Sequence, residues 1–485
     1  MRLTPGTAHC SAVATLRPVS DYDESLTPSL ADAKAKPRAS AEWWSSGWRG
    51  VRYPILCFLT LAALLYLSVY LSNEYLVRNA HYPIREHLVF RGAGVLEGWV
   101  RYDGGWYGLI ASRGYSYQPG AQSAVAFFPG YPMSMRAVGW VLGDVFLAGV
   151  AITFASGLTT AVLMYRWCLR VLSEKTARAA VLMMLLFPYA WYVYGAVYAD
   201  ALFLMCVLAA FVLVEQDRPV LAGAVAAVAT ATRPIGIGVI VGLVVVHLEH
   251  RDVIAIPYLD RVRQLGWRAA RREHQVGRDP LESEANPLPP DAKESRQRPV
   301  SLSLAKLRTR DAGVLLACSG LAGWCAYLAS AYGNPLLFSE IEGAPGWDQA
   351  QGPSTWLKVE WFRALSELPH YVADLGQFSG QLVFTMGLTF QGALAIACVA
   401  LLPLVVRRIG WSYAVYTLAV VMLPVLGTKD WQGTGRYLLA AFPVFAALAD
   451  WMLETHRGLL RSGFVASGLL LVLLTTGYAR GYYLA

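Results

Sequence analysis

Charge is scarce in this sequence. Only 15% of its 485 residues are Asp, Glu, Lys or Arg, whereas a soluble domain usually carries about 25%. Hydrophobic residues make up 56% of the chain. This shortage of charge argues against an ordinary soluble protein and predicts a chain that crosses a membrane several times.

Paired cysteines and metal-binding spacings are also lacking. The seven cysteines include no Cys-x-x-Cys pair, and six of them fall in or beside apolar segments. His and Cys do not cluster, and the Asp-x-Asp motif at 21–23 lies in the polar N-terminal region. We therefore expect no disulfide framework, no metal site and no cofactor.

Two polar regions interrupt the apolar sequence. Residues 1–52 are rich in Pro, Ser and Ala and lack the apolar core of a signal peptide, so we predict a disordered cytoplasmic tail. Residues 249–311 are mixed in charge and rich in Pro, which favours a solvated cytoplasmic linker; a basic patch for anionic lipid headgroups is the alternative. Aromatic residues are not interleaved with the basic ones there, so nucleic-acid binding is not expected.

Eleven apolar segments approach the roughly 20 residues that a bilayer crossing requires. Several are short and interrupted by Pro, so the count ranges from nine to thirteen. The predicted fold class is an all-α polytopic membrane protein. The segments are 53–72, 138–165, 177–197, 200–215, 219–232, 234–248, 312–332, 382–406, 411–427, 437–453 and 463–480.

The distribution of Lys and Arg sets the expected orientation. With the N-terminus inside, 29 of the 41 Lys and Arg residues fall in inner segments and 12 in outer ones. The conspicuous polar features then gather outside: Asp103, Asp200, Arg233, and the loops 332–347 and 427–437. Because charged groups near bilayer depth are costly and tend to mark functional sites, this predicts one extracytoplasmic site.

Each of these residues also has an ordinary structural explanation. Asp103 could be a solvated loop acid paired with a nearby arginine, or part of a turn, since "YDGG" suits one. Asp200 could cap the helix that follows it. Arg233 and Arg436 could extend their side chains to the membrane interface.

Several motifs resemble those of a known family. "RYDGGWYGLIASRGY" (101–115) followed by "AFFPGYP" (126–132) resembles the first luminal loop of the PIG-V family, the glycosylphosphatidylinositol mannosyltransferases. The likeness keeps its order over residues 53–480, and its departures are Tyr102 in place of the usual Trp and Asp200 where Glu is commoner. The later motifs are "FPYAWYVYGAVYADALF" (187–203), "ATRPIGI" (231–237), "YGNPLLF" (332–338) and "GRYLLAAFPVF" (435–445).

The resemblance, which is to bacterial members, implies a GT-C class glycosyltransferase in the plasma membrane. Such enzymes take a sugar, here mannose, from a polyprenyl-phosphate donor on the extracytoplasmic face and invert its anomeric centre. The acceptor is a lipid or a glycan. By this likeness Asp103, in the outer loop 73–136, is the general base.

The chemistry itself suggests roles for further residues. Transfer to a hydroxyl needs a base, while the phosphate leaves without protonation and needs cations, for which Arg is well suited. Gly104 would let a sugar approach the backbone. The other candidates are Arg233, Arg436, Lys429 and Arg101 for the donor phosphate, and Trp106, Tyr107, Tyr115 and Asp200 for the substrate.

Three other functions compete with the transferase. A transporter or flippase should show repeated halves with broken helices at midplane, and no clear internal repeat is present. A protein O-mannosyltransferase should carry an adjacent Asp-Glu pair, but Gly104 follows Asp103. A non-catalytic lipid-binding subunit is the third alternative. Flux of substrate in liposomes that contain no acceptor would distinguish a transporter from a transferase.

Overall fold

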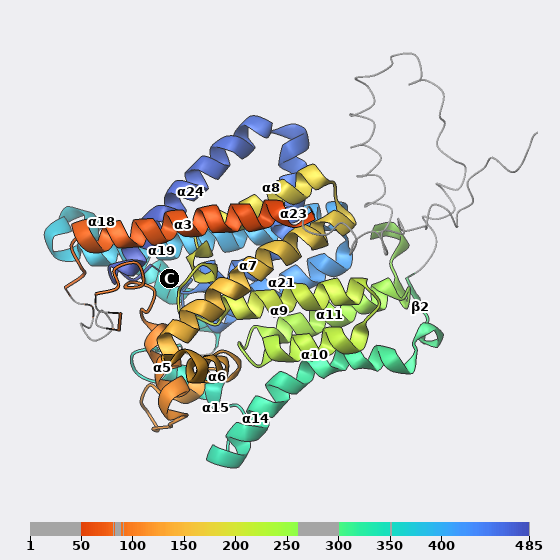
Figure 1. Ribbon diagram of the computed structural model, residues 1–485, viewed down its shortest axis with the longest axis horizontal. Helices are drawn as coiled ribbons and strands as arrows, with labels where there is room; N and C mark the ends of the chain where they lie inside the picture. The colour runs from red at the N-terminus through yellow and green to blue at the C-terminus, as the bar shows by residue number, and fades with distance from the viewer. Residues whose placement is uncertain are drawn as a thin grey trace, which may run out of the picture. The chain divides into compact units, whose positions relative to one another are not determined.

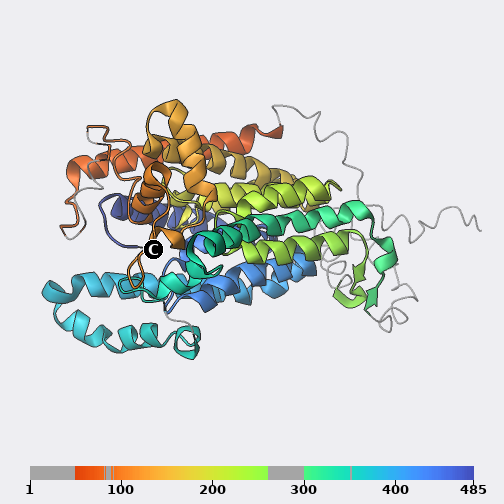
Figure 2. The same cartoon turned by 90° about the horizontal axis from the view of Figure 1, so that it is seen from below.

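The computed structural model describes most of the chain outside its two long polar regions (Figure 1 and Figure 2). Most of the expected tail, 1–52, and the centre of the expected linker, 249–311, lie outside the described residues. The described residues are 50–80, 82, 89–90, 92–259, 300–349 and 352–484.

The described chain is mostly helical. Its only strands are β1 (Ile254–Ala255) and β2 (Ser301–Leu302), which pair antiparallel with Ile254 opposite Leu302. This short ribbon brings together the two ends of the linker 249–311. The predicted all-α class is therefore confirmed for the residues that the structure describes.

Five helical segments within the described ranges are long and apolar enough to cross a membrane. A sixth candidate is the bent pair Thr434–Ala440 and Phe442–Thr455, whose halves meet at 75°. The other apolar helices have fewer than 18 residues, so length and composition identify five or six of the eleven expected crossings. The five are α3 (Arg52–Tyr75), α7 (Val145–Val171), η7 with α14 (Thr309–Cys318, Ser319–Tyr332), Ser379–Ala400 within α19 (Leu375–Ala400), and α24 (Arg457–Ala479).

Shorter helices complete the bundle and its loops. The shorter helices of the bundle are α8 (Glu174–Leu185), α9 (Asp200–Glu215), α10 (Pro219–Thr230), α11 (Gly236–His250), α20 (Leu402–Arg408), α21 (Trp411–Gly427), α22 (Thr434–Tyr437), η9 (Leu438–Ala440) and α23 (Phe442–Thr455). In the loops are α5 (Asp103–Arg113), η3 (Ala124–Ala126), α6 (Gly130–Leu142), η4 (Ala190–Val193), η6 (Leu304–Lys306), α15 (Leu337–Glu340), η8 (Ile341–Gly343), α16 (Pro353–Trp356), α17 (Val359–Ser366) and α18 (Leu368–Ala373).

The expected crossing 177–197 is not one helix. α8 ends at Leu185, and the chain continues through Pro188 into the short 3₁₀ turn η4. Proline has no backbone N–H and clashes with the preceding turn, so the helix stops before it. The segment from Tyr189 to Tyr198 is nevertheless almost wholly buried, and it leads directly to Asp200.

Close helix packing depends on small residues. α7 lies against α9, α6, α3 and α8, and α11 lies against α21. At Gly157 of α7 a Cβ atom would clash with the carbonyl oxygen of Val193 and lie 3.0 Å from the Phe58 ring. Glycine at this position therefore lets the buried turn after α8 rest directly on α7.

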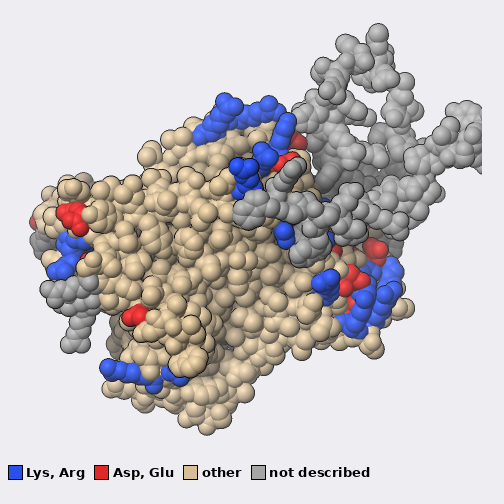
Figure 3. All heavy atoms as spheres, in the orientation of Figure 1, with Lys and Arg blue, Asp and Glu red and all other residues tan. Residues whose placement is uncertain are grey.

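Polar groups occupy opposite ends of the same helices. α9 begins at Asp200 and ends at Glu215, about 22 Å apart at 1.5 Å per residue. At the Glu215 end, Tyr413 donates to Glu215 at 3.0 Å and Arg408 pairs with Asp450 at 3.0 Å. Figure 3 shows a broad face without charge between charged groups toward either side. This arrangement suits a bundle with an apolar belt.

Gly157→Ala should destabilise the protein by about 1–3 kcal/mol, because the added methyl group overpacks the contact with Val193. Gly463→Ala is the matched control: it lies in α24, and no heavy atom lies within 4 Å of the place that its added methyl group would take. Thermal unfolding in detergent should show a lower midpoint for Gly157→Ala and an unchanged or higher one for Gly463→Ala. Equal midpoints for the two variants would contradict this packing.

Candidate functional site

Four of the charged residues singled out in the sequence meet at one end of the bundle. Asp103 begins α5, Asp200 begins α9, Arg233 lies in the turn between α10 and α11, and Arg436 lies in α22. The backbone N–H of Gly130 donates to Ala231 O at 2.7 Å. That bond ties the "AFFPGYP" segment to the Arg233 turn.

Asp103 and Arg436 form an ion pair across 333 positions of sequence. Arg436 Nη1 lies 3.0 Å from Asp103 Oδ2. The guanidinium carbon also lies 5.0 Å from the ring centre of Tyr198 and 5.6 Å from that of Tyr192, within the range of cation–π attraction. The Asp103 side chain is 29% exposed and that of Arg436 15%, so the carboxylate is held but accessible.

The backbone before Asp103 is strained. Tyr102 has φ 52° and ψ −115°, an unusual conformation for a residue with a side chain. Its N–H donates to Tyr82 Oη at 2.6 Å, and its own hydroxyl donates to Gly481 O at 2.7 Å. The N–H of Asp103 donates to Tyr198 Oη at 3.1 Å. These bonds hold the start of α5 in place, and strain of this kind is concentrated at functional sites.

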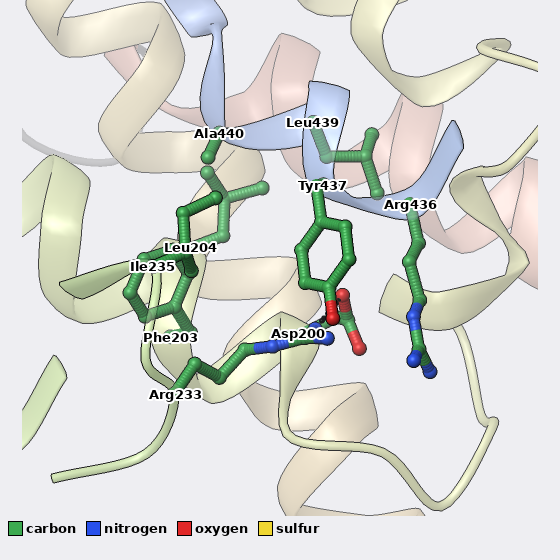
Figure 4. A pocket seen from close by; sticks show the side chains of 9 residues that line it. All are labelled: Asp200, Phe203, Leu204, Arg233, Ile235, Arg436, Tyr437, Leu439 and Ala440. Atoms are coloured by element: carbon green, nitrogen blue, oxygen red, sulfur yellow. Dashed lines mark ion pairs between the residues drawn. The ribbon is translucent and has the colours of Figure 1, made fainter. Parts of the chain in front are cut away.

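A second ion pair, Asp200 with Arg233, lies deeper, with each side chain 6% exposed. Asp200 Oδ2 is buried and has no hydrogen-bond partner among the described residues. Tyr437 lies between the two arginines, with its ring centre 4.4 Å from the Arg233 guanidinium carbon and 5.4 Å from that of Arg436 (Figure 4). Two cations therefore flank one aromatic ring.

Two small cavities open beside these pairs. One is lined by Asp200, Arg233, Arg436 and Tyr437 with apolar neighbours, and the other by Asp103, Arg436 and tyrosines. Each has a volume of about 10 Å³, near the least that holds one water molecule. Arg436 lines both, so it forms part of the wall between them.

Two of the candidate phosphate-binding residues have other partners. Arg101 is fully buried, and its guanidinium donates to Ala479 O at 3.0 and 2.6 Å and to Val100 O at 2.8 Å. It thereby fixes the end of α24. Lys429 is half-buried, and its backbone N–H donates to Gln349 Oε1 at 2.9 Å. Neither residue lines the two cavities.

The predicted substrate-binding residues divide between the site and the surrounding packing. A Cβ on Gly104 would lie 3.3 Å from Val197 O, so this glycine brings α5 close to the segment before α9. The Tyr107 ring lies 6.1 Å from that of Tyr198, and Trp106 stacks on Phe127 at 5.8 Å. Tyr115 donates to Phe127 O at 3.0 Å, packs on Trp324 and lines neither cavity.

Glu342 and Lys358 were not singled out from the sequence. Glu342 in η8 is half-buried, and desolvation together with the Asp103 carboxylate raises its pKa to about 7. Burial lowers the pKa of Lys358 to about 8. The Lys358 ammonium donates to Val425 O and Thr428 O and so caps the C-terminal end of α21. No local motif marks either position.

No family model, curated protein or solved structure matches this chain. Among the described residues, no three His, Cys, Asp or Glu side chains gather closely enough to hold a metal ion. The site consists of two carboxylate–guanidinium pairs, a ring between the cations and a surrounding wall of tyrosines. Such an arrangement can accept a proton and bind an anion.

Arg233→Met should reduce the free energy of unfolding by about 3–5 kcal/mol, because it leaves the buried Asp200 carboxylate without its cation. Adding Asp200→Asn should recover part of this loss, since no unpaired charge then remains. Arg363→Met breaks the exposed pair with Glu360 and should change stability by about 0.5 kcal/mol or less. The free energy of unfolding of all three variants is measured in mixed detergent micelles. An equal loss for Arg233→Met alone and for Arg233→Met combined with Asp200→Asn would contradict the pairing.

Glu342 should make stability depend on pH. Its pKa is about 7 in the folded protein and 4.5 in its unperturbed state, so the folded protein binds the extra proton between these values. The contribution of protonated Glu342 to the free energy of unfolding is then fully present below about pH 4.5 and is lost as the pH rises through 7. Glu342→Gln should raise the thermal midpoint relative to wild type at pH 8 but not at pH 4.5. A difference that is the same at both pH values would refute this.

Proposed function

We propose that the protein is an inverting glycosyltransferase that moves a hexose from a polyprenyl-phosphate donor to a lipid or glycan acceptor on the extracytoplasmic face. The observation that carries the proposal is the accessible Asp103 carboxylate, held by Arg436 beside a second cation, Arg233. One group in the site can take a proton while others receive an anion. Mannose is the sugar that the PIG-V-like motifs suggest.

Asp103 acts as the base in this reaction. The acceptor hydroxyl attacks C1 of the sugar, a new C1–O bond forms, and the C1–O bond to phosphate breaks. The hydroxyl proton passes to Asp103, and both electrons of the broken bond stay with the phosphate. Because no covalent sugar–enzyme intermediate is needed, one carboxylate suffices for inversion. A positioned base contributes about 10²–10⁴-fold to the rate.

Arg436 and Arg233 receive the charge of the departing phosphate. A planar guanidinium suits the oxygens of a phosphate, and fixed cations in a partly buried site act more strongly than they would in water. Both guanidinium groups line the cavity beside Asp200 and Tyr437, so a phosphate that enters this cavity contacts both. The proposal therefore assigns donor binding to these two arginines and leaves Arg101 and Lys429 out of it.

The same proposal places the chain in a plasma membrane of bacterial type, as a multi-pass protein of about eleven crossings. The short apolar helices α8–α11 and α21–α23 supply the crossings beyond the five long ones. The ion pairs of Asp103 and Asp200 then face outward. The ends of α9 and α23 that carry Glu215 and Asp450 face the cytoplasm, with the tail 1–52 and the linker 249–311.

Asp103→Asn should reduce transfer at least 100-fold while leaving the thermal midpoint near that of wild type, because the amide keeps the shape but cannot accept the proton. Turnover is measured in detergent with polyprenyl-phosphate mannose and envelope lipid extract, by mass spectrometry of the products. Asp348→Asn, on the exposed loop after η8, is the control and should keep full activity.

Wild-type turnover by the Asp103→Asn variant would rule out the role of base. Movement of a lipid-linked sugar across liposomes that contain no acceptor would instead favour a transporter.

A further inference from the structure

Tyrosine rings surround the cavity next to Asp103. Five of them line it, together with Leu484 and the Asp103–Arg436 pair. They come from three separate parts of the chain: the residue before α5, the segment from η4 to the start of α9, and the end of α24 with the residues that follow it. The cavity is therefore built by the tertiary fold and not by one local motif.

Two buried polar atoms of this cavity's residues have no hydrogen-bond partner among the described residues. They are the Tyr478 hydroxyl oxygen and Arg436 Nε. Tyr478 is only 1% exposed, so bulk solvent cannot satisfy its hydroxyl. Since nearly all buried polar atoms in native proteins have a partner, these two point to a polar ligand that the cavity is made to receive.

The chemistry of the lining selects the class of ligand. Aromatic faces suit the C–H groups of a saturated ring, while the hydroxyl of Tyr478 and the guanidinium of Arg436 offer hydrogen bonds to its oxygens. An acyl chain would leave both polar atoms unpaired and is therefore disfavoured. A phosphate is better served by the neighbouring cavity, where Arg233 joins Arg436. A ring that carries several hydroxyl groups meets all these requirements.

We propose that this cavity is the acceptor subsite and binds a hydroxylated six-membered ring, a sugar or a cyclitol, with one hydroxyl directed to Asp103. The inference rests on the proposed glycosyl transfer for the direction of the reaction. Arg436 then separates the acceptor from the donor phosphate, because it lines both cavities.

The subsite is narrow in this structure. Its volume of about 10 Å³ holds at most about one water molecule, so a ring enters only when part of the lining moves. Tyr483 and Leu484, in the segment after α24, are the part that we assign to this movement. The Tyr483 hydroxyl accepts from Gln432, and its ring lies 4.8 Å from that of Tyr102 and 5.9 Å from that of Phe384. Their withdrawal opens the space beside Asp103.

Tyr478→Phe tests the subsite. It removes a hydroxyl that has no partner among the described residues of the free protein, so the thermal midpoint without ligand should stay the same or rise. Tyr194→Phe is the matched control: it is equally buried, but its hydroxyl donates to Leu185 O at 2.9 Å, so its midpoint should fall. Both variants are made in the full chain and purified in detergent.

Binding is measured with two probes, soluble methyl α-D-mannopyranoside and phosphatidylinositol in mixed micelles, which distinguish a free glycan from a lipid headgroup. At least one probe should raise the wild-type and Tyr194→Phe midpoints by the same increment. Tyr478→Phe should show a smaller increment. The subsite is refuted if neither probe raises the wild-type midpoint, or if Tyr478→Phe keeps the full increment.

Turnover separates this inference from the proposed function. With polyprenyl-phosphate mannose as donor, Tyr478→Phe should raise the KM of the acceptor about threefold to tenfold, as the loss of one hydrogen bond implies, and leave the KM of the donor within about twofold. Transfer with an unchanged acceptor KM would overturn the subsite but not the transferase. If the wild-type protein transfers no sugar but binds a probe in a manner that depends on Tyr478, the proposed transferase function is overturned and the binding subsite is not.

Discussion

The need to pair charge inside an apolar bundle determines the arrangement of this end of the molecule. A buried carboxylate or guanidinium is costly unless an opposite charge accompanies it. Asp200, at the start of α9, forms an ion pair with Arg233, in the turn after α10. Asp103, at the start of α5, forms one with Arg436 of α22. Tyr437 between the two cations links both pairs into one electrostatic unit. A carboxylate that can accept a proton and cations that can bind an anion therefore belong to the same group of residues.

Most of what could be predicted came from the composition and from the charged residues at the ends of apolar segments. The shortage of charge predicted the helical class, and the positions of Asp103, Asp200, Arg233 and Arg436 beside apolar segments predicted that they would meet. Each of these four is a charged residue at the edge of an apolar segment, so a single sequence reveals it. Helix breaks were harder, because Pro188 ends α8 inside a continuous apolar run.

The remaining site residues depend on long-range packing that a local pattern does not encode. In the sequence Arg101 is a candidate for binding the donor phosphate, yet its guanidinium donates to Ala479 O at the end of α24. Tyr115 was predicted to contact the substrate, and the fold packs its ring on Trp324. Conversely, Tyr478 is an aromatic residue near the end of an apolar helix, and only the tertiary fold brings it beside Asp103.

The bonds from Arg101 to Ala479 and from Tyr102 to Gly481 have a consequence for biogenesis. They join a loop made early by the ribosome to residues made almost 380 positions later. Until α24 and the residues that follow it have been synthesised, the strained turn before Asp103 lacks the anchors that Ala479 and Gly481 supply. A nascent or truncated chain that ends before these residues therefore cannot complete the centre.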